Sequence, residues 1–343
     1  MIYLVLGFIL IFYSYLEAIE YNYEISRFAF ALSAILLILF AGLRDGTIVG
    51  TDSPAYYTNY VSPFWETEPG YKFINFLFSS KLNANYNVFL LFLNGFSIYL
   101  MCKFVSKNSV YLVLPFLIFY SDLYLYFNIS GIRQGIAMSI TCFAMYYAVR
   151  KKMKYFLFFI VCAAMFHVSS LIFIFAYFLP RKSLKFKSII ILVITFGVTI
   201  ALVNFLGSQF EYLTKKLLFY SELQEKPDRI EILYLIGVSK RAIIIILSFV
   251  YRKYLFLDEK YTYLFNIYLI GFLIFVATYL ISPDFGVRLS VYYTIVDCVL
   301  AGYMLSLVNT RSKRMLIVTV FSAIAIYKLL GYMTNEYYTY RFF

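Results

Sequence analysis

Residues 150–187 read RKKMKYFLFFIVCAAMFHVSSLIFIFAYFLPRKSLKFK, an apolar stretch with a basic flank on each side. Each flank holds four basic residues: Arg150, Lys151, Lys152 and Lys154 before the stretch, and Arg181, Lys182, Lys185 and Lys187 after it. Because basic residues beside membrane spans favour the cytoplasm, we expect both flanks on that side of a membrane. The run 155–179 is then a broken or re-entrant pair of short helices, with His167 at the bend.

The composition of the whole chain is typical of a membrane protein. Of its 343 residues, 63% are hydrophobic and 14% charged, with a mean hydropathy of +0.79, which exceeds what one soluble core can hide. Further apolar runs that could cross a membrane lie near residues 2–16, 27–43, 86–105, 110–127, 133–149, 188–206, 232–251, 262–281, 288–307 and 313–330. We predict an all-α polytopic integral membrane protein with about 10–12 transmembrane helices, forming a single domain over residues 1–343.

Placing both flanks inside orients every other loop by alternation. Further basic groups then face the cytoplasm, namely Lys103 and Lys107; Arg252, Lys253 and Lys260; and Arg311, Lys313 and Arg314. The outward-facing loops are residues 44–72 and about 207–231. The net charge of +12 mostly reflects this topology and suits anionic lipid headgroups, and we expect no nucleic-acid partner.

The cysteines and the single histidine bear on metal binding. All four cysteines lie inside apolar runs without CxxC spacing, so they are best interpreted as small buried hydrophobic residues. One histidine argues against the common His-rich metal sites, although carboxylates alone can hold Mg²⁺. We expect no bound transition metal and no cofactor.

The outward loop 44–71, RDGTIVGTDSPAYYTNYVSPFWETEPGY, combines carboxylates with aromatic residues. Its acidic residues include Asp52 and Glu68, and its aromatic residues include Tyr56, Tyr57 and Trp65, the only tryptophan of the chain. This combination is typical of a carbohydrate site. The alternative for each aromatic residue is a place in the interfacial belt.

Ionisable residues far apart in the sequence come to the same outer depth in this topology, namely Arg44, Asp122, Arg133, His167 and Arg288. Charges near a bilayer are costly and are often paired or functional. A guanidinium group grips phosphate oxygens bidentately, so the cluster suits a lipid diphosphate joined to a sugar. Each ionisable residue also has a structural alternative. Arg44 and Arg288 could equally extend to the membrane interface, and Arg241 either extends to the interface or joins the cluster. His167 could be a core histidine.

Several motifs resemble those of the EpsG/Wzy-type polysaccharide polymerases. RDGTIVGTDSPAYYTNY (44–60) is similar to the family's Arg-x(n)-Gly-Thr-Asp-x(n)-Tyr motif, and ETEPGYKFINFLF (66–78) to its Glu-x-Gly-Tyr segment. GIRQGIAMSI (131–140) and AAMFHVSSLIF (163–173) resemble its Arg-Gln and Phe-His-x-Ser pair. FGVRLSVYY (285–293) resembles its C-terminal Arg-x-x-x-Tyr.

The resemblance implies a multi-pass, GT-C-like glycosyltransferase of the bacterial cytoplasmic (inner) membrane. Such enzymes polymerise O-antigen or exopolysaccharide, moving a growing glycan from undecaprenyl diphosphate onto a lipid-linked repeat unit at the outer face. It also implies that no metal is needed. The expected partners are undecaprenyl-diphosphate-linked oligosaccharides and membrane lipids, with a chain-length regulator and a flippase as candidates.

This reaction gives each candidate residue a role. An acceptor hydroxyl must lose a proton, so we expect a base, first His167 and then Asp52 or Glu68. The candidates for binding the departing diphosphate are Arg44, Arg133, Arg288 and Arg241. The candidates for binding sugar are Trp65, Tyr56, Tyr57 and Gln134.

Three other functions remain open from the sequence. A lipid-linked oligosaccharide flippase or other transporter would share the membrane class, but it should show internal repeats and polar residues at the midplane. A glycan ligase would use nearly the same chemistry as a polymerase. An acyltransferase could use the single histidine as its base, although the Gly-Thr-Asp loop speaks against it.

Overall fold

The computed structural model describes residues 2–62, 67–182 and 230–343 of the chain. Within these ranges the regular structure is helical, and an isolated β-bridge joins Arg44 to Phe342. Eight helices in these ranges are long and apolar enough to cross a membrane. The chain is therefore an all-α polytopic membrane protein, as the sequence predicted. The predicted span 188–206 and most of the outward loop 207–231 lie outside the described residues.

The chain forms two compact units. Unit 1 comprises Met1–Tyr177 and Asp297–Phe343, and unit 2 comprises Phe178–Val296. Both units consist of apolar helices, so the single membrane domain that we expected stays a prediction.

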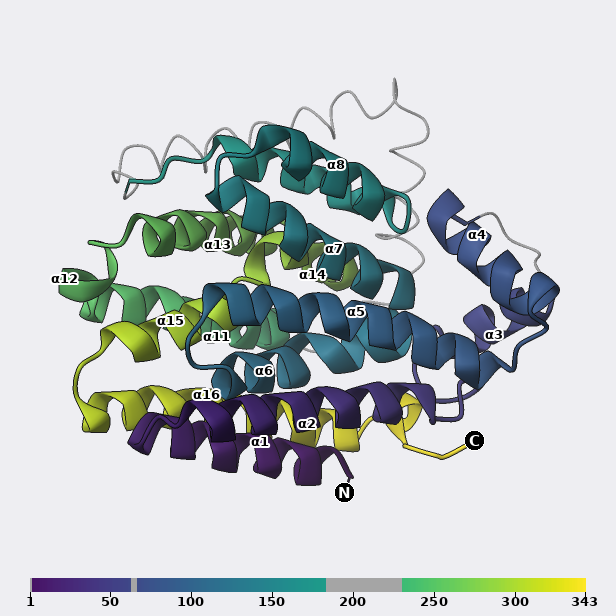
Figure 1. Ribbon diagram of the computed structural model, residues 1–343, viewed down its shortest axis with the longest axis horizontal. Helices are drawn as coiled ribbons and strands as arrows, with labels where there is room; N and C mark the ends of the chain where they lie inside the picture. Colours follow the sequence, from purple (N-terminus) through teal and green to yellow (C-terminus); the bar gives the residue numbers. More distant parts are fainter. Residues whose placement is uncertain (1, 63–66, 183–229) are drawn as a thin grey trace. The chain divides into compact units, whose positions relative to one another are not determined.

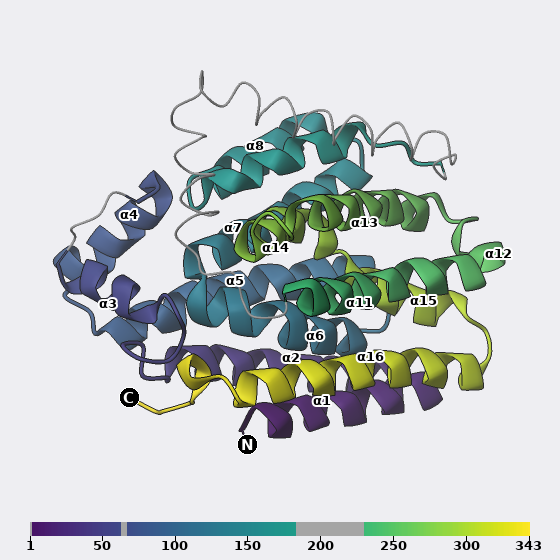
Figure 2. The ribbon, with the colours of Figure 1, turned by 180° about the vertical axis from the view of Figure 1, so that it is seen from behind.

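Unit 1 is a bundle in which α1 (Ile2–Ile19) packs on α16 (Arg311–Met333), and α2 (Tyr23–Gly42) on α5 (Tyr86–Asn108). Next to α5 lies α7 (Ile132–Val149), and α1 and α15 (Asp297–Leu307) both pack on α6 (Val113–Phe119) (Figures 1 and 2). α6 continues as a π-helical segment, η2 (Tyr120–Ser130).

Buried polar side chains fix the centre of this bundle. The Asn128 amide of η2 donates hydrogen bonds to Asn94 Oδ1 (3.2 Å) and Ser97 Oγ (3.1 Å) of α5. Ser97 also hydrogen-bonds Ser139 of α7 (2.8 Å). Such bonds join helices in lipid, where no water competes for these groups. They set the relative positions of α5, η2 and α7, and so the place of the first turn of α7.

The apolar run 155–179 forms a hairpin of two short helices, α8 (Met153–Ala164) and the 3₁₀-helix η3 (Val168–Phe178). The Phe156 ring near the start of α8 lies 5.2 Å from the Tyr177 ring near the end of η3. A continuous helix would separate these residues by about 30 Å. The two helices are therefore antiparallel, which confirms the predicted pair of short helices with His167 in the turn between them.

The two ends of unit 1 differ in charge. One end holds the basic groups around Lys103, Lys107, Arg150 and Arg314, where Arg314 donates a 2.5 Å hydrogen bond to the Tyr111 hydroxyl. We call it the basic end. At the other end, the motif end, residues 43–52 lie beside α3 (Ser53–Val61), α4 (Pro69–Phe76) and the C-terminal residues 336–343. Segments that the predicted topology puts on one side of a membrane thus lie at one end of unit 1, and the side that each end faces stays a prediction.

Unit 2 contains α11 (Ile230–Val250), α12 (Arg252–Leu255), α13 (Glu259–Thr278) and α14 (Pro283–Thr294). α13 packs on both α11 and α14, and the Tyr268 hydroxyl donates a 2.9 Å hydrogen bond to the backbone carbonyl of Arg241.

Candidate active site

The loop after α2 is held by Arg44. Its guanidinium is completely buried and donates to the carbonyls of Ala41, Val49 (3.3 Å) and Ile129 (2.8 Å). These bonds close the loop on itself and tie it to η2. We predicted that Arg44 binds a diphosphate, but a buried guanidinium turned to backbone carbonyls is not open to a ligand. Arg44 instead satisfies carbonyls that would otherwise be buried without a donor.

The C-terminal residues hold the same loop from the other side. Gly50 adopts a φ of +110°, which favours glycine, and its N–H donates to the carbonyl of Tyr337 (2.7 Å). Ser130, at the end of η2, hydrogen-bonds the Tyr338 hydroxyl (2.9 Å). The Gly-Thr-Asp motif is therefore fixed by two distant segments.

The Glu-x-Gly-Tyr segment docks on the turn of the hairpin. The N–H of Gly70 donates a 2.8 Å hydrogen bond to the carbonyl of Met165, and a Cβ at this glycine would lie only 2.8 Å from the same oxygen. Tyr71 is completely buried, with its ring 5.7 Å from that of Tyr56. Gly70 thus permits the close approach, Tyr71 anchors it, and together they bring Glu68 beside His167.

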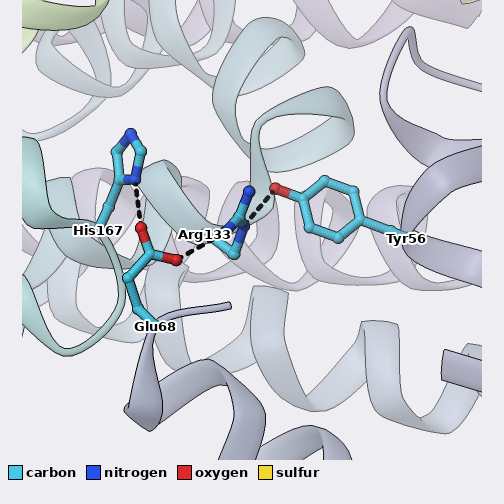
Figure 3. Close-up of polar contacts among 4 residues, drawn as sticks. All are labelled: Tyr56, Glu68, Arg133 and His167. Carbon is cyan, nitrogen blue, oxygen red and sulfur yellow. Dashed lines mark hydrogen bonds and ion pairs between the residues drawn. The ribbon is translucent and has the colours of Figure 1, made fainter. Parts of the chain in front are cut away.

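Four side chains from distant segments form one continuous cluster (Figure 3). Arg133, in the first turn of α7, donates to Glu68 Oε2 (2.6 Å) and to the Tyr56 hydroxyl (3.2 Å). His167 Nδ1 lies 3.0 Å from Glu68 Oε1. The side chains of Glu68, His167 and Arg133 are 17%, 19% and 24% exposed, so the cluster is largely shielded yet within reach of a ligand.

The charges around Glu68 decide its protonation. Burial raises the pKa of Glu68, but the hydrogen bond from His167 and the charge of Arg133 outweigh this and lower it to about 2. Glu68 is therefore ionised and can only accept hydrogen bonds. His167 must then donate from Nδ1, so that in its neutral form Nε2 carries the lone pair.

This arrangement separates the roles of the predicted bases. A carboxylate with a pKa of about 2 is a weak base near neutral pH, so Glu68 is suited to orienting His167 rather than to taking a proton. A carboxylate that fixes the tautomer of a histidine recurs in enzymes that use a histidine base.

Other predicted residues lie around the cluster. Asp52 is the half-buried N-cap residue of α3, and its charge, after burial, contributes to a raised pKa of Tyr56. Gln134 follows Arg133 but is only 3% exposed, which leaves little surface for a sugar. Tyr57 is 38% exposed and belongs to a different face of α3 from Tyr56. Trp65 lies outside the described residues.

Arg288 and Arg241 belong to unit 2. Arg288 pairs with Asp284 one turn earlier (3.2 Å). The Arg241 guanidinium lies 3.6 Å from the centroid of the Phe275 ring. Their proposed contact with a diphosphate stays a prediction.

The sequence did not indicate the pairing of Arg133 with Tyr56 and Glu68 or the docking of Gly70 on Met165. It also did not indicate a role for the C-terminal residues, whose only signal was their aromatic content. Within residues 2–62, 67–182 and 230–343, no group of three or more His, Cys, Asp or Glu side chains is arranged to hold a metal ion.

The chain was compared with known proteins and protein families. No curated protein and no solved structure matches the chain. The family model described as the EpsG family matches residues 27–342, which include every residue of the cluster. The chain therefore belongs to the EpsG family.

Proposed function

We propose that this protein polymerises a surface polysaccharide, O-antigen or exopolysaccharide, at the outer face of the bacterial cytoplasmic membrane. Membership of the EpsG family indicates a role of the polysaccharide-polymerase type, and the apolar helices make the chain a multi-pass membrane protein. The proposal adds the donor, a growing glycan on undecaprenyl diphosphate, and the acceptor, a lipid-linked repeat unit.

The observation that carries the proposal is the hydrogen-bonded chain from Tyr56 through Arg133 and Glu68 to His167. It joins a titratable base, a carboxylate that orients it and a cation, the groups that glycosyl transfer from a diphosphate requires. It lies at the motif end of unit 1, away from the basic end, which the charge bias assigns to the cytoplasm. This position supports an outward-facing site.

The reaction assigns a task to each group. The acceptor hydroxyl gives its proton to His167 Nε2 as its oxygen bonds to the anomeric carbon of the donor. The bond from that carbon to the diphosphate breaks, and the electron pair leaves with the diphosphate. Glu68 stabilises the imidazolium that forms, and Arg133 supplies positive charge beside the leaving group. Arg288 and Arg241 of unit 2 are further candidates for binding the diphosphate.

The test is the length distribution of surface polysaccharide in a deletion strain, with and without the parent gene returned. Loss of polymer with single repeat units still attached to their final acceptor supports a polymerase. Long chains trapped on the lipid carrier would identify a ligase instead. Lipid-linked repeat units held on the cytoplasmic side would identify a flippase.

A further inference from the structure

A cavity at the motif end of unit 1 lies apart from the cluster. It measures about 510 Å³, a size that suits small-molecule binding. Its lining includes Asp45, Thr47, Tyr57, Asn85, Asn87 and Phe343, and neither Arg133, Glu68 nor His167 is among its lining residues. Tyr57 and Tyr56 are neighbours on α3, and consecutive helical residues point about 100° apart, so the cavity and the cluster lie on different faces of that short helix.

The polar walls of the cavity are held rigidly. Asp45 Oδ1 accepts hydrogen bonds from the backbone N–H (3.0 Å) and the hydroxyl (2.5 Å) of Thr47. The Asn87 amide donates to the carbonyls of Gly42 and Arg44, both at 2.9 Å. Preformed walls reduce the entropy that a ligand loses on binding.

The chemistry of the lining selects a class of ligand. One carboxylate, two amides and a threonine hydroxyl offer both acceptors and donors, and the exposed Tyr57 offers an aromatic face. The lining residues, all within the described part of unit 1, include no lysine or arginine. A phosphate would meet Asp45 without a compensating cation, whereas the hydroxyls of an uncharged sugar can donate to the oxygens of Asp45 and Asn87.

We infer that this cavity, here called the Tyr57 cavity, is a second glycan subsite. The inference rests on the proposed function and gives it a further component. The subsite holds a sugar residue away from the bond being formed, so that the glycan is bound at two places. A chain held in this way stays on the enzyme between additions, and weakening the subsite should shorten the polymer.

The inference is tested by binding, with the full-length protein in lipid nanodiscs. The probe is the lipid-free repeat-unit oligosaccharide of the parent organism's own polysaccharide, and saturation-transfer NMR gives its Kd. We expect Tyr57→Ala to raise the Kd at least about tenfold, because the exposed ring is lost. Tyr337→Ala removes a tyrosine at the same end that is more exposed than Tyr57 (61% against 38%), and it should leave the Kd within about twofold of the parent value.

A second variant removes charge rather than the ring. Asp45→Asn keeps the oxygen that Thr47 needs, so the loop should stay intact while the Kd rises about threefold. If Tyr57→Ala does not accumulate, the Kd of Asp45→Asn tests the subsite inference. A parental Kd in the folded Tyr57 and Asp45 variants, or no binding by the parent, would overturn the inference.

Turnover measured on the same preparations separates this inference from the proposed function. If Tyr57→Ala loses binding, while His167→Gln binds the oligosaccharide like the parent but transfers no glycan, both proposals stand. If the parent transfers no glycan while Tyr57→Ala still loses binding, the subsite stands and the polymerase proposal fails. If the parent polymerises and Tyr57→Ala binds the oligosaccharide like the parent, the polymerase proposal stands and the subsite inference fails.

Discussion

Two glutamates at opposite ends of unit 1 are both withdrawn from water, but they are held in different ways. At the basic end, Glu17 is 4% exposed and accepts hydrogen bonds from the Ser26 hydroxyl and from the backbone N–H groups of Leu112 and Val113, both at 3.0 Å. At the motif end, Glu68 bonds two ionisable side chains, Arg133 and His167.

The difference shows how a buried carboxylate can be interpreted. Glu17 supplies acceptors to the N–H groups at the start of α6, which a helix cannot satisfy itself, so its role is structural. Glu68 instead controls the charge and orientation of groups that can exchange protons or bind anions. Removing the first should disturb the fold, and removing the second should disturb the reaction.

The largest effect is expected from His167→Gln. Glutamine can hydrogen-bond Glu68 but cannot take a proton usefully near neutral pH, so transfer should fall at least about 100-fold. Polymer in a strain carrying this variant, normalised to the amount of protein in the membrane, measures the loss. Parental polymer would make His167 a residue of the turn only, and Asp52 would become the leading candidate for the base.

Glu68→Gln is expected to reduce transfer about 100-fold or somewhat less. The amide can no longer fix the His167 tautomer or stabilise the imidazolium, although its size is unchanged. The same assay reports the result. If Glu68→Gln reduces polymer only in proportion to the protein level, the role of Glu68 is structural, like that of Glu17. The proposed difference between the two glutamates is then wrong.

Arg133→Lys should reduce transfer about tenfold. Lysine keeps the charge but loses the planar fork that reaches Glu68 and Tyr56 together. Arg133 lies over the Tyr56 ring, 5.7 Å from its centroid. Arg150→Lys is a matched control, because Arg150 lies over the Tyr146 ring, 3.5 Å from its centroid, at the basic end. Equal polymer in both strains would show that Arg133 is only an anchor.

The smallest effect on transfer is expected from Glu17→Gln. The amide accepts fewer of the hydrogen bonds at the start of α6, which should cost about 1–3 kcal/mol of stability. Thermal unfolding of the purified protein should therefore begin at a lower temperature, while the rate per folded molecule stays near the parental rate. A normal melting temperature with lost transfer would assign Glu17 to the reaction instead.

Much of the fold was predictable, because apolar length and flanking charge report depth in a membrane. The hairpin of short helices followed from two basic flanks around the apolar run 155–179, and Arg133 and His167 were predicted at one depth. Depth does not give the direction in which a side chain points around a helix. For this reason the pairing of Glu68 with both residues was not predicted, nor was the burial of Arg44 against backbone carbonyls. Contacts of the C-terminal residues, such as the bond between the Tyr3 hydroxyl and the carbonyl of Tyr338, join positions 335 residues apart and leave no local pattern.

The most direct test of the account is the pH dependence of a single glycan transfer by the purified protein in lipid nanodiscs. Neutral His167 is the active form, so the parent rate should be low in acid and rise with pH as the imidazole loses its proton. Glu68 should add no second step near neutral pH, because its pKa is about 2. His167→Gln should show no such rise and almost no transfer at any pH. A His167→Gln variant with the parental rate and the parental pH profile would contradict the assignment of the base.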